Sequence, residues 1–231
     1  NLIVKDGGRI EAATLGIGEG GSIKINASES VEFAGWQQLL EENISVTGLS
    51  ASAGVEDGSI AYGSEQSSIA QTQNGGNIEI DTKELKVADG AEVTVSNFGS
   101  GDAGTLEIEA DSILLGDRAR LNATTTSGNG GNINLQNVDN LVLQDLAQIA
   151  TSAGAKGNGG NISIDANTVT VINNSKISAD AFEGKGGNIE IKTQGLCQSP
   201  DRQITAASPL GINGLVSIEN NGLDTSRSIL K

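Results

Sequence analysis

Pairs of carboxylates placed two positions apart are the first candidates for catalytic residues in this 231-residue sequence. Glu79 and Asp81 form one such pair, and Glu107 and Glu109 form another. Two carboxyl groups held roughly 5–10 Å apart can cleave a glycosidic bond, one as acid and the other as base or nucleophile. The sequence has no histidine, one Trp and one Tyr. The other groups that an active site needs are therefore scarce, and the favoured interpretation is a solvated acidic surface without catalytic residues.

An acidic residue also recurs at one place in each repeat. The equivalent positions hold Asp6, Asp89, Asp117, Asp145 and Asn173, and Asp201 is displaced by one position. Stacked carboxylates could bind Ca²⁺. Asp and Asn also close turns by accepting hydrogen bonds from nearby backbone N–H groups. We favour turns and expect no cofactor or metal, because the glycine-aspartate nonapeptide of Ca²⁺-binding solenoids does not occur. Ca²⁺ stays the open alternative.

Two aromatic residues lie in the irregular stretch after Phe33. Trp36 and Tyr62 could contact a sugar or a partner, since long loops often carry function. They could equally hold their own loop against the scaffold, because a single tryptophan is a poor sugar platform. The spacing in Trp36-Gln-Gln-Leu-Leu-Glu-Glu predicts one or two helical turns near Trp36.

Composition narrows the function classes. Acidic residues exceed basic ones by 29 to 14, a net charge of −15, so nucleic acid is not an expected partner. The single Cys197 leaves no internal disulfide framework and no cysteine zinc site. No run of about 18 apolar residues is available to span a membrane. Because the sequence starts inside a repeat and without methionine, we expect it to be part of a longer precursor.

An internal repeat organises these residues. A Gly-Gly-polar-aliphatic signature recurs, and its second glycine or equivalent falls at positions 21, 76, 104, 131, 160, 187 and 214. The first interval is 55 residues, and the later ones are close to 27. The first interval is therefore one period plus an insertion of about 28 residues. We interpret residues 34–75 as a loop insertion within one coil and residues 214–231 as a terminal partial coil.

Each repeat holds three short segments in which apolar residues alternate with polar ones. After Ile78 these are Ile80, then Leu85 and Val87, then Val93 and Val95. A period of two indicates strands rather than helices. The sequence therefore predicts an all-β fold, a single right-handed parallel β-helix over residues 1–231 with three-stranded coils of about 27 residues.

The predicted corners between segments have their own signature. We expect the paired glycines to supply positive φ at sharp bends. Asparagine follows the glycine pair in most repeats, so stacking would align these side chains in a hydrogen-bonded ladder. The predicted ladder consists of Asn77, Asn132, Asn161 and Asn188.

Several stretches resemble the cyanobacterial branch of filamentous-haemagglutinin-like exoproteins of the two-partner secretion type. They are Asn1-Leu-Ile-Val-Lys-Asp-Gly-Gly, Ile25-Asn-Ala-Ser-Glu-Ser-Val-Glu, Ile204-Thr-Ala-Ala-Ser-Pro-Leu-Gly-Ile and Gly211-Ile-Asn-Gly-Leu-Val-Ser-Ile-Glu. The resemblance implies a β-helix exported by a dedicated outer-membrane transporter, with a role in adhesion, the cell surface or the extracellular matrix. It offers no catalytic residues.

One face of the predicted coil differs from the others. Outward positions of the second segment include apolar residues, whereas those of the first segment are mostly acidic or amide. We interpret this stripe as a contact with another solenoid or partner, the alternative being that the chain covers it itself. The residues are Leu114, Val142, Thr170, Ile172 and Cys197, with Ile3 further along.

Taken together, the residues and the resemblance predict a secreted structural or adhesive β-solenoid rather than an enzyme. The expected partners are a second copy, another surface protein or a glycan. The alternative is a polysaccharide lyase or hydrolase on the same fold, which would need a groove with aromatic residues beside an acid or metal cluster.

Overall fold

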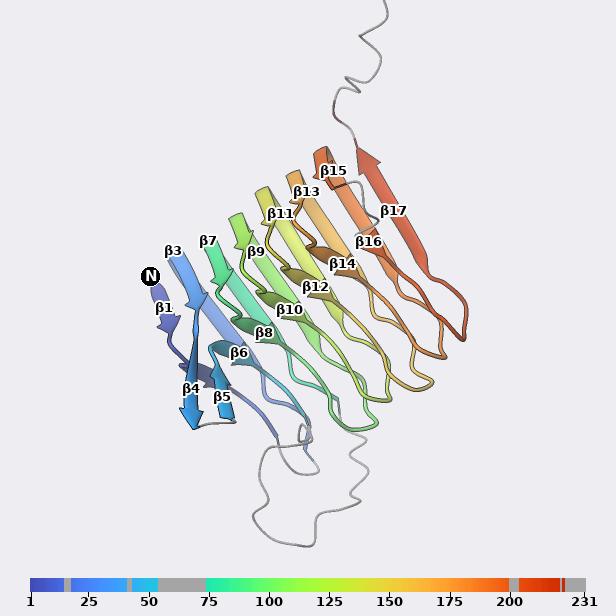
Figure 1. Cartoon of the computed structure of the whole chain (residues 1–231), viewed down its shortest axis with the longest axis horizontal. Coiled ribbons are helices and arrows are strands. Elements are labelled where there is room, and N and C mark those ends of the chain that lie inside the picture. Colours follow the sequence, from blue (N-terminus) through green and yellow to red (C-terminus); the bar gives the residue numbers. More distant parts are fainter. Residues whose placement is uncertain (15–17, 41–42, 54–73, 200–203, 221, 223–231) are drawn as a thin grey trace, which may run out of the picture.

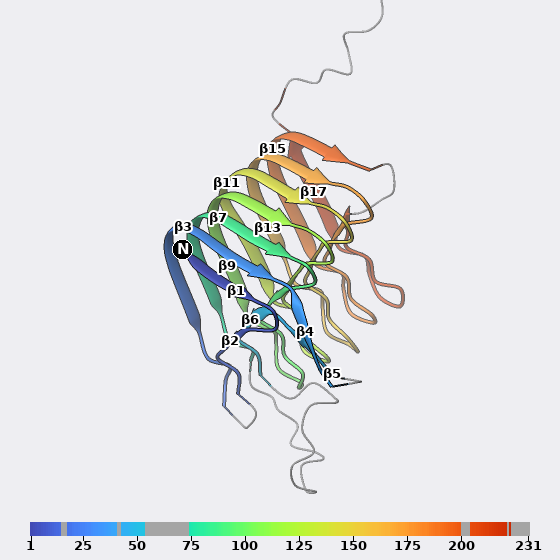
Figure 2. The ribbon, with the colours of Figure 1, turned by 60° about the vertical axis from the view of Figure 1, so that its left-hand side comes forward.

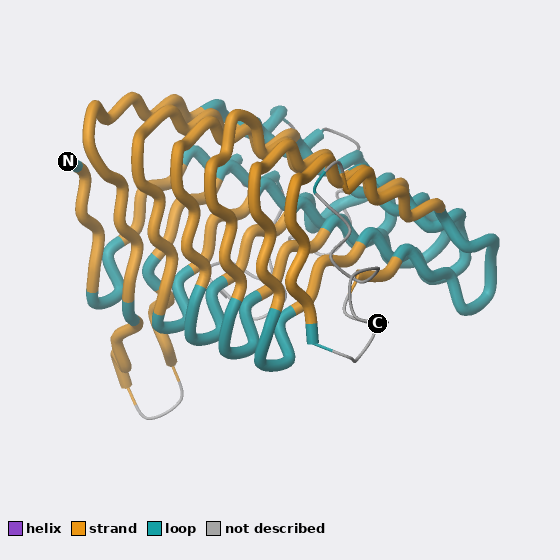
Figure 3. Tube along the Cα trace, turned by 90° about the horizontal axis from the view of Figure 1, so that it is seen from above, coloured by secondary structure: helices purple, strands orange, loops and turns teal. Residues whose placement is uncertain are grey.

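The structure, a computed structural model, describes all residues except 15–17, 41–42, 54–73, 200–203, 221 and 223–231. The described residues form strands and loops, and Figure 3 shows strands winding between loops along the stack. Within these residues there is no helix of the length and apolarity that crossing a membrane requires.

Two parallel sheets run the length of the stack, with β1 and β17 at opposite ends (Figure 1). The longer sheet contains, in order, β1 (Leu2–Lys5), β3 (Ile23–Ala34), β7 (Ile78–Ala88), β9 (Thr105–Leu115), β11 (Asn132–Leu143), β13 (Ile162–Val171), β15 (Asn188–Gln198) and β17 (Leu215–Asn220). The shorter sheet contains β2 (Arg9–Glu11), β6 (Gly48–Ser50), β8 (Glu92–Thr94), β10 (Arg120–Asn122), β12 (Gln148–Ala150), β14 (Lys176–Ser178) and β16 (Ile204–Thr205). The predicted all-β solenoid is confirmed.

The three predicted segments are present, but the first two form one long strand. In β7 the inward residues alternate up to Thr82, and then Lys83 and Glu84 are both exposed before the alternation resumes at Leu85. Two exposed residues in a row shift the pattern by one position. The strand thus turns from one face of the coil to the next without a loop, and the third segment lies on the shorter sheet.

A third line of backbone pairing, made of single bridges, joins the loops that follow the shorter-sheet strands. Single parallel bridges link Thr14, Ala53, Asn97, Thr125, Ala153 and Ala181 from coil to coil. These positions are small or polar residues, most of them buried. The extra residue of the repeat after Ile133 appears as a bulge in β11, where Asn137 has a φ of 57° and the register shifts.

Stacking of equivalent positions produces a narrow aliphatic core. Leu85, Ile113, Leu141 and Val169 stand in one column, and each is at most 1% exposed. Because each inner strand pairs with its copies above and below, each inward column is continuous and water is excluded along it. A core made of such columns needs no large aromatic residue, in agreement with the composition.

The helix predicted near Trp36 is wrong. Trp36–Leu40 is strand β4, and it pairs antiparallel with β5 (Asn43–Val46) in a hairpin that leaves the stack (Figure 2). The hydroxyl of Ser45 donates to the carbonyl of Gly7, which ties the hairpin to the preceding coil. Pairing between strands and this contact override the local helical spacing.

The predicted insertion at 34–75 is also too broad. Thr47 is fully buried, and Gly48–Ser50 forms β6, which pairs with β2 and β8 as an ordinary third segment. The described insertion is therefore the hairpin, placed between the second and third segments of one coil. The remainder of the predicted insertion, residues 54–73, lies outside the described residues.

The glycine pairs have a different cause from the one predicted. Positive φ occurs at Gly7, Gly35 and Gly90, not at the second glycines of the pairs. Those glycines instead let adjacent coils approach: a Cβ on Gly131 would lie 1.9 Å from the carbonyl oxygen of Gly104, and one on Gly160 would lie 1.7 Å from that of Gly131. Close backbone approach, rather than bending, requires glycine here.

The predicted asparagine ladder forms over three coils. The Nδ2 group of Asn161 donates to Oδ1 of Asn132 at 3.0 Å, and that of Asn188 donates to Oδ1 of Asn161 at 3.1 Å. At the fourth predicted position, Oδ1 of Asn77 accepts from the backbone of Thr105 at 2.8 Å, because that coil lacks the asparagine. The ladder gives the polar side chains at this corner of the coil their hydrogen-bond partners.

A second ladder stands on the other side of the glycine pairs. Asp102 Oδ1 accepts from both the backbone and the side chain of Asn129, at 2.7 and 3.1 Å, and Asn129 Oδ1 accepts from Asn158 in the same way. The sequence signal was the asparagine preceding each pair, in the motif Asn-Gly-Gly-Asn at 129–132 and 158–161.

Candidate interaction surface

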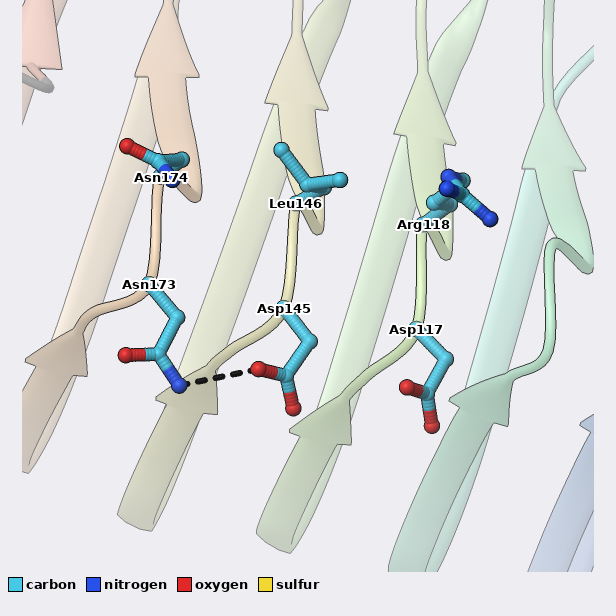
Figure 4. A pocket seen from close by; sticks show the side chains of 6 residues that line it. All are labelled: Asp117, Arg118, Asp145, Leu146, Asn173 and Asn174. Carbon is cyan, nitrogen blue, oxygen red and sulfur yellow. Dashed lines mark hydrogen bonds between the residues drawn. The ribbon is translucent and has the colours of Figure 1, made fainter.

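The recurring acidic residues occupy tight turns between the two sheets (Figure 4). Asp89, Asp117, Asp145 and Asn173 have φ between 49° and 56°, and the residue after each also has positive φ. A backbone bond closes each turn across four residues, for example Ala119 N to the carbonyl of Gly116 at 3.1 Å. Two successive positive φ angles with this bond are the pattern of a type I′ turn, in which Asp and Asn are favoured.

Turn geometry therefore accounts for the acidic column. Asn173 Nδ2 donates to Asp145 Oδ1 at 2.8 Å, so side chains of successive turns also bond to one another (Figure 4). Among the described residues no three His, Cys, Asp or Glu side chains gather closely enough to hold a metal ion. Asp201, the displaced member of the series, lies outside the described residues.

Replacing Leu146 in one of these turns provides a test of the geometry. The first two turns place glycine after the aspartate, as Gly7 and Gly90, but Leu146 has a φ of 68°. This conformation costs an ordinary residue about 1–2 kcal/mol. We expect Leu146→Gly to be about 1 kcal/mol more stable to urea unfolding than Leu146→Ala, which loses the side chain but keeps the strain. Equal stability of the two variants would contradict the assignment.

The carboxylates that could have formed an active site point outward from the long strands. Glu79, Asp81, Glu107 and Glu109 are all exposed on the first-segment face. Polar side chains of neighbouring coils bind several of them: Lys24 pairs with Glu79, and Asn137 Nδ2 donates to Glu109 at 2.6 Å. The arrangement is a ladder of cross-coil pairs along a solvated face.

Of the two predicted loop-contact residues, Trp36 can be placed. It lies on the hairpin strand β4 and is 54% exposed. With half of its surface in water, Trp36 contributes modest burial to the hairpin. The hydrogen bond from the Ser45 hydroxyl to the carbonyl of Gly7 holds the hairpin to the preceding turn. Tyr62 lies outside the described residues.

The predicted contact residues lie together on the outward side of the second segment. Strand register places Leu114 beside Val142, Val142 beside Thr170, and Thr170 beside Cys197. Cys197 is exposed and the other three are half-buried. Ile172 falls in the next column, because its N–H bonds to the carbonyl of Leu143 just as that of Gln144 bonds to Leu115.

Absence of charge, more than apolarity, distinguishes this surface. Three adjacent columns over four coils contain small, amide, hydroxyl and aliphatic residues. We call them the uncharged face, made of Ser112, Leu114, Gly116, Asn140, Val142, Gln144, Thr168, Thr170, Ile172, Gly195, Cys197 and Ser199. None of the twelve positions holds Asp, Glu, Lys or Arg, in a chain of which 19% of residues are of these types.

Two of these three columns become charged toward the N-terminal coils, and the column of Ser112 continues to Glu84. Glu32 and Lys86 continue the column of Leu114, and they separate it from Ile3 at the end of the stack. Glu32 bonds to the ammonium groups of Lys5 and Lys86 at 3.0 Å each. Hydrogen bonding to Lys5, followed by that to Lys86, lowers the pKa of Glu32. The uncharged face therefore ends at a line of ion pairs.

Comparison of the chain with models of protein families, with curated protein sequences and with solved structures found no match. The surface itself thus carries the functional argument.

Proposed function

We propose that this β-solenoid is a secreted structural or adhesive element of a bacterial cell surface, fibre or extracellular matrix, and that the uncharged face is its contact surface. The observation that carries the proposal is the uncharged face itself. Large regions free of charge are unusual on an acidic protein, because charged side chains keep surfaces soluble and apart. The neighbouring first-segment face, in contrast, presents carboxylates such as Glu79, Asp81, Glu107 and Glu109 to water.

The size of the uncharged face indicates how it binds. Strand spacings of about 4.8 Å between coils and 3.3 Å along the chain make it about 15 Å on each side. A stable interface buries roughly 800 Å² on each partner, which is several times the area of the uncharged face. A single contact is therefore weak, and strong attachment requires many copies presented together, as on a surface or in a matrix.

Location outside the cell rests on different support. The stretches beginning at Asn1, Ile25, Ile204 and Gly211 resemble exoproteins of the two-partner secretion type. That resemblance supports export through a dedicated outer-membrane transporter. The resemblance also supports a non-catalytic role. That role would be contradicted if the protein released new reducing ends from an acidic polysaccharide and if Glu107→Gln abolished this activity.

The contact is tested by placing charge on the uncharged face. Leu114→Lys with Val142→Lys should reduce attachment of bead-displayed protein to bacterial surface material at least tenfold, because two ammonium groups must then be desolvated in the contact. The matched control is Asn134→Lys with Ser163→Lys, which adds the same charge in neighbouring coils of the first-segment face. Unchanged attachment of a folded Leu114/Val142 double variant would rule this face out.

A further inference from the structure

Asparagine followed by glycine recurs in this chain, and the proposed adhesive role does not use it. The step occurs five times, and two of these lie in inner coils, at Asn129-Gly130 and Asn158-Gly159. Glycine has no side chain to shield its backbone nitrogen, so that nitrogen reaches the preceding side-chain amide more easily than in other dipeptides. Asparagine is accordingly one of the thermolabile residues of proteins.

The reaction open to such a step is deamidation, with water as the only co-reactant. The glycine nitrogen forms a bond to Cγ of the asparagine and the Cγ–Nδ2 bond breaks. Nδ2 leaves as ammonia, together with the proton of the glycine N–H. Water then opens the cyclic imide to aspartate or isoaspartate. The reaction therefore needs a side-chain amide that is free to turn and a glycine N–H that is free to lose its proton.

Exposure alone would make Asn129 reactive, because its side chain is open to water. Its hydrogen bonds oppose the reaction. Nδ2 donates to Oδ1 of Asp102 at 3.1 Å, and Oδ1 accepts from both the backbone and the side chain of Asn158, at 3.1 Å each. The N–H of Gly130 donates to the carbonyl of Asn158 at 2.8 Å. All four bonds must break before the imide can form.

Asn158 is held in the same way. Its Nδ2 donates to Asn129, its Oδ1 accepts from the backbone of Lys185 at 2.9 Å, and the N–H of Gly159 donates to the carbonyl of Lys185 at 2.8 Å. These bonds join one coil to the next. Freeing the reacting groups therefore means separating adjacent coils at this corner.

We propose that Asn129 and Asn158 are deamidation sites that the closed stack blocks and that react only when adjacent coils separate. This inference is independent of the adhesive role, since it uses the corner ladder and not the uncharged face. Each hydrogen bond lowers the population of the broken state by a factor of roughly 2–10. Three or four bonds broken together therefore slow the reaction by about tenfold or more, and local opening of the coils sets its rate.

Deamidation of Asn129 also hinders an opened coil from closing again. The product lacks the Nδ2 donor and sets a second carboxylate against Oδ1 of Asp102, where like charges oppose each other. The product formed at Asn158 instead faces the neutral amide of Asn129. Opening at the first site is thus recorded as a lasting loss of stability.

The sites are tested by incubating the full chain, folded and unfolded in guanidinium, in the same mildly alkaline buffer. Peptide mass spectrometry measures aspartate and isoaspartate at each position. Both asparagines should deamidate at least about tenfold more slowly in the folded chain. Equal rates in the two states would overturn the proposal, and so would an unfolded chain that stays unmodified.

Two variants at the exposed Asp102 test the ladder itself. Asp102→Ala removes the acceptor of Asn129, so deamidation of Asn129 in the folded chain should rise several-fold while that of Asn158 stays unchanged. Asp102→Asn keeps an acceptor oxygen and should restore protection. Circular dichroism verifies folding. An equal rise at both asparagines would show that general loosening, and not the ladder, controls the reaction.

Product variants test the loss of stability. Asn129→Asp should unfold at a lower urea concentration than Asn158→Asp, because only the first opposes a carboxylate. Added salt should narrow the difference by screening the two charges. An Asn129→Asp protein as stable as the wild type would refute the lasting effect.

Discussion

Gly160→Ala should lower the free energy of unfolding by about 3 kcal/mol, the upper part of the range for overpacking a tight interior. The added Cβ would lie 1.7 Å from the carbonyl oxygen of Gly131 and 2.7 Å from its carbonyl carbon. Both atoms belong to the backbone of the adjacent coil, so no side chain can rotate away. The coils can relieve the contact only by separating, which weakens the strand pairing on either side.

Urea unfolding followed by far-ultraviolet circular dichroism measures this effect. The matched control is Gly195→Ala in β15, where a Cβ would meet only Cγ2 of Thr168, at an ordinary 3.9 Å. That control should lie within about 1 kcal/mol of the wild type, since replacing glycine by alanine is otherwise a small change. Equal unfolding of the two variants would mean that adjacent coils do not stack as closely as described.

Thr151→Val should raise the free energy of unfolding by about 1–2 kcal/mol. Thr151 is fully buried in a core column whose other members include Val95, Ala123 and Ala179. Within the described part of the chain its hydroxyl oxygen has no hydrogen-bond partner. Burying such a group without a bond costs about 1–3 kcal/mol, and valine removes the hydroxyl while keeping the volume.

The comparison variant for this position is Thr151→Ser. It keeps the buried hydroxyl and loses a methyl group, so it should be roughly 1 kcal/mol less stable than the wild type. Together the two variants separate the hydroxyl from the packing. A destabilised Thr151→Val protein would show that the hydroxyl does find a partner, and that the column is polar at this coil.

Repetition explains why so much of the fold could be predicted. Ile78, Leu85 and Val93 begin three segments whose spacing recurs in later repeats, with one extra residue after Ile133, so the same pattern predicts the fold several times along the chain. Alternation with period two states which residues face inward without knowledge of distant contacts. The asparagine ladder followed from the same argument, because stacking brings equivalent residues together.

The hairpin could not be predicted from the repeat pattern. Trp36 and Leu40 have helical spacing over a short window, a signal too weak to outweigh strand pairing. β4 becomes a strand because β5 lies beside it and because Ser45 reaches Gly7, a residue 38 positions earlier. No repeat of this segment exists in the chain, so nothing in the pattern could correct the local reading.

The uncharged face shows a second limit. Leu114, Val142, Thr170 and Cys197 could be aligned from the period alone, and the structure places them in one column. The columns that flank it depend on where each long strand bends and where the turn to the shorter sheet begins. Ser112 and Gly116 can be assigned to the uncharged face only from the positions of those bends in the structure.

The sequence by itself determined the inward columns, the coil period and the chemistry of the turns, because these depend on residue types repeated at fixed spacing. Only the tertiary structure decided how closely coils approach and where the long strands bend to set the borders of the uncharged face. Gly160 illustrates the difference: its recurrence is visible in the sequence, but the reason is a carbonyl oxygen 29 residues away, at Gly131. Distances between coils are set by the packing of whole backbones, which no local pattern records.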